Sequence, residues 1–209
     1  MTGDPAHETE PVGGGLVQAT LASAGIGAVA GALAGFVWGG IGGRIAMRIV
    51  FLTSDDAVRG LTSDDGFEIG RISGNTIFLL FFTTILGAIA GLLYGLLRMV
   101  TAGPVWAVAT GVTIATASAA GAAIVHTDGV DFRFLDPVWL TVGLFVFLPG
   151  GWALTVVLLE ERLVRADGPL GSLPPLVRRR YRGRTGWVIL AALTVLGISD
   201  LVSDIATLT

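Results

Sequence analysis

The sequence contains no cysteine and no lysine, and it has only two histidines, His7 and His126. Without cysteine there is no thiol nucleophile, no iron–sulfur ligand and no disulfide from which a compartment could be inferred. Without lysine, Schiff-base chemistry and the lysine of a phosphate-binding P-loop are excluded. The thirteen basic residues are all arginine. These absences remove many classes of enzyme.

Charge of either sign is also scarce. Charged residues make up 14% of the chain and hydrophobic residues 53%, with 31 glycines and a mean hydropathy of +0.78. A soluble chain of this length is usually about a quarter charged, so this composition cannot cover a surface that faces water. The composition predicts an integral membrane protein.

Five apolar segments are long enough to cross the bilayer, since about 20 residues span the ~30 Å of hydrocarbon. They lie at about 16–43, 76–98, 104–126, 138–160 and 186–206. Lipid offers no partner to open backbone groups, so the segments must be helices. The sequence therefore predicts an all-α integral membrane protein, a five-helix bundle forming one transmembrane domain over 16–206. Residues 1–15 lack a basic residue, which indicates a disordered tail rather than a signal peptide.

Arginine distribution predicts the topology. The connector 160–185 carries seven of the thirteen arginines, so the positive-inside rule makes it cytoplasmic. Alternating spans then place the N-terminus in the cytoplasm and the C-terminus outside the plasma membrane. Five arginines near the last span favour binding to anionic lipid headgroups: Arg178, Arg179, Arg180, Arg182 and Arg184. A short connector tied to the bilayer is too small to follow nucleic-acid phosphates, so we expect no nucleic-acid partner.

Glycines recur every four residues in the first two spans. The ladder of the first span is Gly27, Gly31, Gly35, Gly39 and Gly43, preceded by Ser23, and that of the second is Gly87, Gly91 and Gly95, preceded by Thr83. This spacing leaves a stripe of a helix without side chains, against which another backbone can lie closely. The stripes predict seams inside the bundle. The alternative is that part of the first stripe joins a second copy in a homo-oligomer.

Two pairs of opposite charges share the same spacing of four. Arg44 and Arg48 follow the first ladder in a segment that either continues as a tilted helix or breaks at the glycines 39–43, and Asp200 and Asp204 lie near the outer end of the fifth span. A charge near hydrocarbon is costly unless it pairs or reaches water. We predict ion pairs between the two sets. The alternative is that the arginines reach lipid headgroups and the aspartates reach water.

The predicted outer loop 53–75 is acidic. Its carboxylates are Asp55, Asp56, Asp64, Asp65 and Glu68, the oxygen ligands that a divalent cation would use. The spacing is not that of an EF-hand, and paired aspartates in exposed turns are mostly solvated. We therefore expect neither a metal site nor a cofactor.

One segment resembles a known group. The stretch Gly43-Arg44-Ile45-Ala46-Met47-Arg48, Thr53, and the run from Ser63 to Gly70 are similar to a pattern in uncharacterised bacterial multi-span membrane proteins. The resemblance covers about residues 40–75 and implies no activity, ligand or catalytic residue.

Proline and glycine interrupt the fourth span at Pro149, Gly150 and Gly151, which predicts a kink. Broken helices build substrate sites in many transporters, but such kinks are also common in structural helices. We find no HExxH motif, no serine in a GxSxG turn and no aspartate pair within a span, so we predict no enzyme. The leading interpretation is a helix-packing subunit, scaffold or sensor with an unspecified protein partner. The alternative is a channel or transporter for small solutes that uses the kinked span.

Overall fold

The computed structural model describes residues 12–54, 74–125, 137–165 and 183–208, and within these ranges every element is helical. The first helix is continuous over three parts, α1 (Val12–Ala34), η1 (Gly35–Gly42) and α2 (Gly43–Thr53). The others are α3 (Gly74–Val100), α4 (Val105–Ile124), α6 (Val138–Val164) and α8 (Thr185–Leu208). The predicted five-helix bundle is confirmed, and all five helices are long and apolar enough to cross a membrane.

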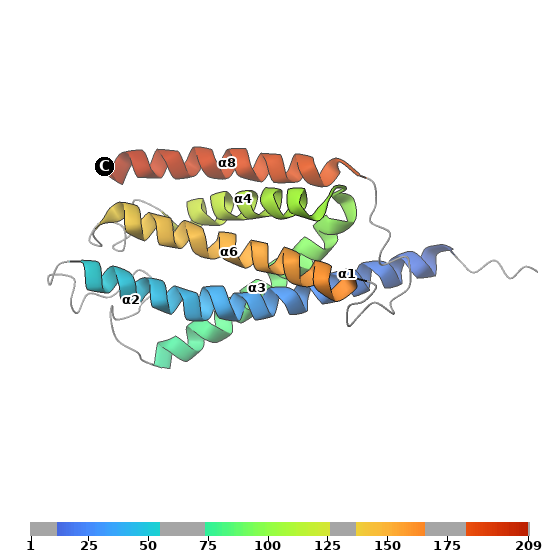
Figure 1. Ribbon diagram of the computed structural model, residues 1–209, viewed down its shortest axis with the longest axis horizontal. Helices are drawn as coiled ribbons and strands as arrows, with labels where there is room; N and C mark the ends of the chain where they lie inside the picture. Colours follow the sequence, from blue (N-terminus) through green and yellow to red (C-terminus); the bar gives the residue numbers. More distant parts are fainter. Residues whose placement is uncertain (1–11, 55–73, 126–136, 166–182, 209) are drawn as a thin grey trace, which may run out of the picture.

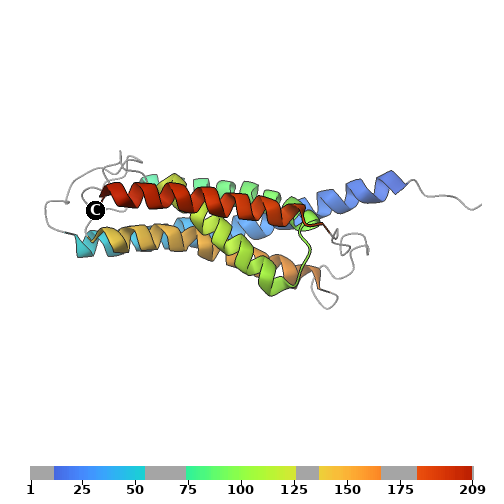
Figure 2. The same ribbon diagram turned by 90° about the horizontal axis from the view of Figure 1, so that it is seen from above.

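The first helix differs most from its predicted bounds. It begins inside the predicted tail, at Val12, and it continues past residue 43 to Thr53. At about 1.5 Å per residue it is roughly twice as long as the ~30 Å hydrocarbon core is thick. The glycine cluster does not break it, because η1 carries the chain onward as a π-helix with wider turns. In Figures 1 and 2 the N-terminal part of α1 extends beyond the other helices.

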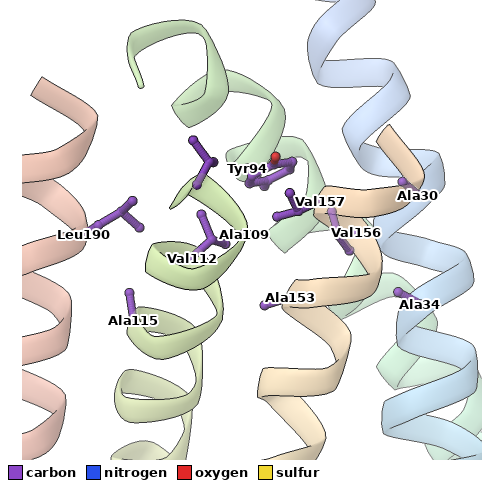
Figure 3. Packing of buried hydrophobic residues seen from close by; sticks show 11 residues of the cluster. Ala30, Ala34, Tyr94, Ala109, Val112, Ala115, Ala153, Val156, Val157 and Leu190 are labelled. Atoms are coloured by element: carbon purple, nitrogen blue, oxygen red, sulfur yellow. The ribbon is translucent and has the colours of Figure 1, made fainter. Parts of the chain in front are cut away.

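Helix α6 holds the bundle together. It packs against α1, η1 and α2 on one side and against α4 on the other, while α8 covers α4 and α3 crosses α1 (Figure 1). The main core is built largely of alanine and valine, contributed by all five helices (Figure 3). Small side chains allow the helix axes to approach closely, which matters in lipid because no hydrophobic drive pulls the helices together.

The outer faces of the bundle are strongly apolar. Phe81, Leu93 and Val195 are each more than half exposed, and side chains of this kind cover much of α3 and α8. Trp106 at the start of α4 and Trp139 at the start of α6 are about three-quarters exposed at opposite ends of the bundle, where indole rings suit the two membrane interfaces. A surface of this extent suits lipid rather than water. The chain is a multi-pass membrane protein.

The two glycine ladders face each other across the α1–α3 seam. Gly27 faces Gly91, and Gly31 faces Gly87. A methyl group added to any of these four glycines would meet the backbone carbonyl oxygen of the glycine that faces it. The clash extends to the facing backbone itself, since a methyl on Gly31 would lie 2.7 Å from the Cα of Gly91. The helices are antiparallel and touch backbone to backbone, as weak Cα–H···O contacts require.

Both ends of the seam keep the same register. Ser23 pairs with Gly95 and donates its hydroxyl to the carbonyl of that glycine at 2.9 Å, and Gly35 faces the backbone of Thr83. Gly39 meets the side chain of Thr83, whereas a methyl at Gly43 would meet nothing within 4 Å. Most of the first ladder therefore lies in an internal seam between α1 and α3, and Gly43 at its end lies outside that seam.

Candidate functional site

A buried ion pair joins α3 to α6 at the end of the bundle where α8 begins. The Nε of Arg98 donates to Oε1 of Glu161 at 3.0 Å, and Nη2 lies 3.0 Å from the same oxygen. The side chains are only 3% and 8% exposed. Arg98 occupies the last turn of α3 and Glu161 the last turns of α6, and the two helices run in the same direction, so their C-terminal ends bring opposite charges together.

The chain around the ion pair is tied into the same network. Arg98 donates from Nη1 to the carbonyl of Thr101 at 2.6 Å, which fixes the turn between α3 and α4. The next residue, Ala102, receives two contacts from the start of α8: its N–H donates to the carbonyl of Gly183 at 3.1 Å, and its carbonyl accepts from the indole of Trp187 at 2.6 Å. The ends of four helices therefore meet through one polar network.

Burial makes this network costly to disturb. A buried charge is tolerated when it is paired and hydrogen-bonded, and removing one partner leaves the other uncompensated. Glu160 adds a second buried carboxylate, 5% exposed, beside Glu161. The arrangement holds helix ends in place. Among the described residues no three His, Cys, Asp or Glu side chains gather as metal ligands would.

Sequence reasoning missed this ion pair because the fourth span was predicted to end at about residue 160, which left Glu160 and Glu161 at the start of the connector 160–185. In the structure α6 extends to Val164, so Glu160 and Glu161 lie within a helix. The sequence did contain a sign of this pair: Arg98 lies at the end of the second predicted span, and Glu160 and Glu161 lie at the end of the fourth. Both ends were predicted at the same membrane face.

The predicted kink site in α6 is filled by a tryptophan. Helix α6 runs through Pro149 unbroken, and a methyl group on Gly151 would come within 2.5–2.6 Å of ring carbons of Trp38 from η1. The ring is held by a hydrogen bond from its Nε1 to Oγ1 of Thr155 at 2.9 Å and by edge-to-face contact with Phe147, with centroids 5.5 Å apart. On the other side, a methyl on Gly150 would lie 3.4 Å from Cβ of Ala117 in α4. Because the two glycines have no side chains, η1 and α4 can pack closely against α6 at this point.

The two charge pairs lie on helices with different neighbours. Arg44 and Arg48 are in α2, which packs against η1 and α6, whereas Asp200 and Asp204 are in α8, which packs against α4 and α3. In Figure 1 both helices end on the left, with α4 and α6 between them. Arg48 also lies over the ring of Phe51, 5.3 Å from its centroid. This helix order does not bring the predicted partners together within one chain.

Several predicted residues lie outside the described residues. These are the acidic-loop carboxylates Asp55, Asp56, Asp64, Asp65 and Glu68 and the connector arginines Arg178, Arg179, Arg180 and Arg182. Arg184 is described and is exposed just before α8. Their roles in cation or lipid binding stay predictions.

Comparisons with known proteins give no relative. No family model matches the sequence, and none of the curated proteins or solved structures compared with it matches either. The resemblance of residues 40–75 to bacterial multi-span proteins stays a prediction.

Proposed function

We propose that this protein works by associating with other membrane proteins, as a subunit, scaffold or sensor, and that it is not an enzyme. In this proposal it lies in the plasma membrane with its N-terminus in the cytoplasm, and the arginine-rich connector binds anionic headgroups. The positive-inside rule supports this orientation.

The observation that carries the proposal is the close packing around Gly150 and Gly151 of α6. A solute path through the kinked span needs space at Gly150 and Gly151, yet the ring of Trp38 and the methyl of Ala117 occupy both sides of the two glycines. Transporter sites usually place an ionisable group or an unwound helix at the middle of the membrane. Helix α6 stays helical there, and its buried carboxylates Glu160 and Glu161 lie near its end. These features favour helix packing over transport.

Two measurements test the proposal. Purification from native membranes under mild conditions should recover the chain together with other polypeptides, identified by mass spectrometry against an untagged control. Proteoliposomes loaded with a panel of small neutral and charged solutes should show the leak rate of empty vesicles. Flux of any one solute that depends on the protein would replace the proposal by a channel or transporter.

The orientation has its own test. Reporter fusions at the N-terminus and within 166–182 should both give cytoplasmic signals, while a fusion after residue 208 should give an external signal. A C-terminal reporter in the same compartment as the connector reporter would contradict the five-span topology.

A further inference from the structure

Contacts with α6 show that Arg44 of α2 and Asp200 of α8 lie at about the same level along the bundle. A methyl on Gly42 would lie 2.9 Å from Cδ2 of Leu148. A methyl on Gly121 of α4 would lie 2.9 Å from Cγ2 of Val146 and 3.8 Å from Cδ2 of Leu201. Gly42 therefore lies at the level of Leu148, and Leu201 lies at the level of Val146. Val146 and Leu148 are two residues apart in α6, so these two levels differ by about 3 Å along the helix axis. Arg44 is two residues past Gly42, so it lies level with Asp200.

The two pairs are also in register. Helices α2 and α8 run in the same direction, each ending at the same end of the bundle (Figure 1). Arg48 follows Arg44 by four residues and Asp204 follows Asp200 by four, so both partners lie about 6 Å further along. The charges therefore form two matched rows at equal depths on opposite sides of the bundle.

Asp200 is exposed on a surface that suits lipid. One turn back on the same face of α8 lies Leu196, which is 62% exposed. Helix α8 continues for eight more residues to Leu208, so the carboxylate lies about 12 Å from the end of the helix. A charge at this position is costly unless it pairs or reaches water. No described residue forms an ion pair with it.

We propose that α8 of one copy of this chain packs against α2 of a neighbouring copy, so that Asp200 pairs with Arg44 and Asp204 with Arg48. The inference rests on the proposed function and names the partner as a second copy. One guanidinium has five N–H donors, so each arginine binds the neighbour's carboxylate alongside the contacts that it makes in its own chain. Two different faces meet, so the contact is heterologous and builds a ring or an open row in the membrane plane.

Disulfide cross-linking in native membranes tests the contact, because the chain has no cysteine of its own. Ile45→Cys and Ser203→Cys place thiols at nearly equal depth on the exposed faces of α2 and α8. Two chains with different tags, each with one of these cysteines, should form a mixed disulfide dimer on oxidation, and the double variant should form higher multimers. The matched control pairs Ser203→Cys with Ile77→Cys, which is exposed on α3 three residues before Leu80, the neighbour of Gly40, and it should stay at background.

Charge reversal separates contact between copies from pairing within one chain. Asp200→Arg/Asp204→Arg presents only positive charge on both faces, and Arg44→Asp/Arg48→Asp presents only negative charge. Each variant alone should lose most of its cross-linking, and co-expression of the two should restore it. Arg184→Asp, at the other end of α8, should leave cross-linking unchanged.

Each outcome decides the inference. Mixed dimers no more abundant than in the Ile77 control, or no recovery on co-expression of correctly inserted reversed chains, would overturn it. If a reversed chain fails to insert, the cysteine pair alone decides, because it leaves all four charges in place. A negative result together with recovery of a different bound protein would overturn this contact and leave the proposed function standing. Solute flux would overturn the proposed function whatever the cross-links show.

Discussion

The indole Nε1 of Trp152 donates a hydrogen bond to the carbonyl oxygen of Gly31 at 3.1 Å. That carbonyl is also the atom that a methyl group on Gly87 would meet first across the α1–α3 seam. One backbone oxygen therefore connects the central helix α6 to the seam between the two glycine ladders. The seam is bound to the rest of the bundle by a polar contact as well as by packing.

We expect Trp152→Phe to weaken this connection. The substitution keeps an aromatic ring but removes the N–H donor and part of the indole, so the cost should be that of one hydrogen bond, about 0.5–1.5 kcal/mol, together with the packing lost from a side chain that lies against the core. Unfolding in mixed micelles, followed by circular dichroism, measures it. Trp139→Phe is the matched control, because Trp139 is 75% exposed and should unfold like the parent. Equal effects of the two changes would contradict the role of the hydrogen bond.

The seam should not tolerate a single added methyl group. Gly31→Ala and Gly91→Ala would each drive a Cβ into facing backbone, which cannot move aside as a flexible side chain can. Overpacking of this kind costs about 1–3 kcal/mol, and we expect a loss of that size in the same unfolding assay.

Two other glycines provide the control for the seam. A methyl at Gly25 in α1 or at Gly143 in α6 meets nothing within 4 Å. Alanine is the better helix former by about 1 kcal/mol, so both changes should leave stability unchanged or raise it. A loss at Gly25 as large as at Gly31 would show that glycine is needed for some reason other than the close approach.

The seam shows how far sequence reasoning reaches in this fold. Spacing of four identifies which face of each helix is bare, so the ladders from Gly27 and from Gly87 could be named in advance. Spacing does not say which bare face meets which, because glycine stripes carry no side chains that select a partner. The antiparallel register from Ser23–Gly95 to Gly35–Thr83 comes from the whole packing.

The pairing of charged residues could not be predicted from the sequence. Matched spacing led to predicted pairs between Arg44 or Arg48 and Asp200 or Asp204, but spacing carries no information about the order of helices around α6. The ion pair found among the described residues, Arg98 with Glu161, has no shared spacing at all. It arises because two helices that run in the same direction end at one level, which depends on where α6 ends.

The contact between Gly151 and Trp38 can be tested with two substitutions that should partly compensate for each other. Gly151→Ala should destabilise the protein, because the new methyl would lie 2.5–2.6 Å from carbons of the Trp38 ring. Trp38→Leu alone should also destabilise it, through a cavity and a lost hydrogen bond to Thr155. The double variant should lose less than the two single losses added together, since the smaller side chain leaves room for the methyl. Strict additivity in unfolding would contradict the contact.

The Arg98–Glu161 pair should behave as a coupled unit. Glu161→Gln or Arg98→Gln leaves one buried charge without its partner, and such losses cost about 3–5 kcal/mol. Replacing both by methionine removes the charges together, so the double variant should be more stable than either glutamine variant. The exposed Arg162 on the same helix gives the control, because Arg162→Gln should change stability by less than about 0.5 kcal/mol. A methionine double variant less stable than both single variants would contradict the view that the two charges act as one coupled unit.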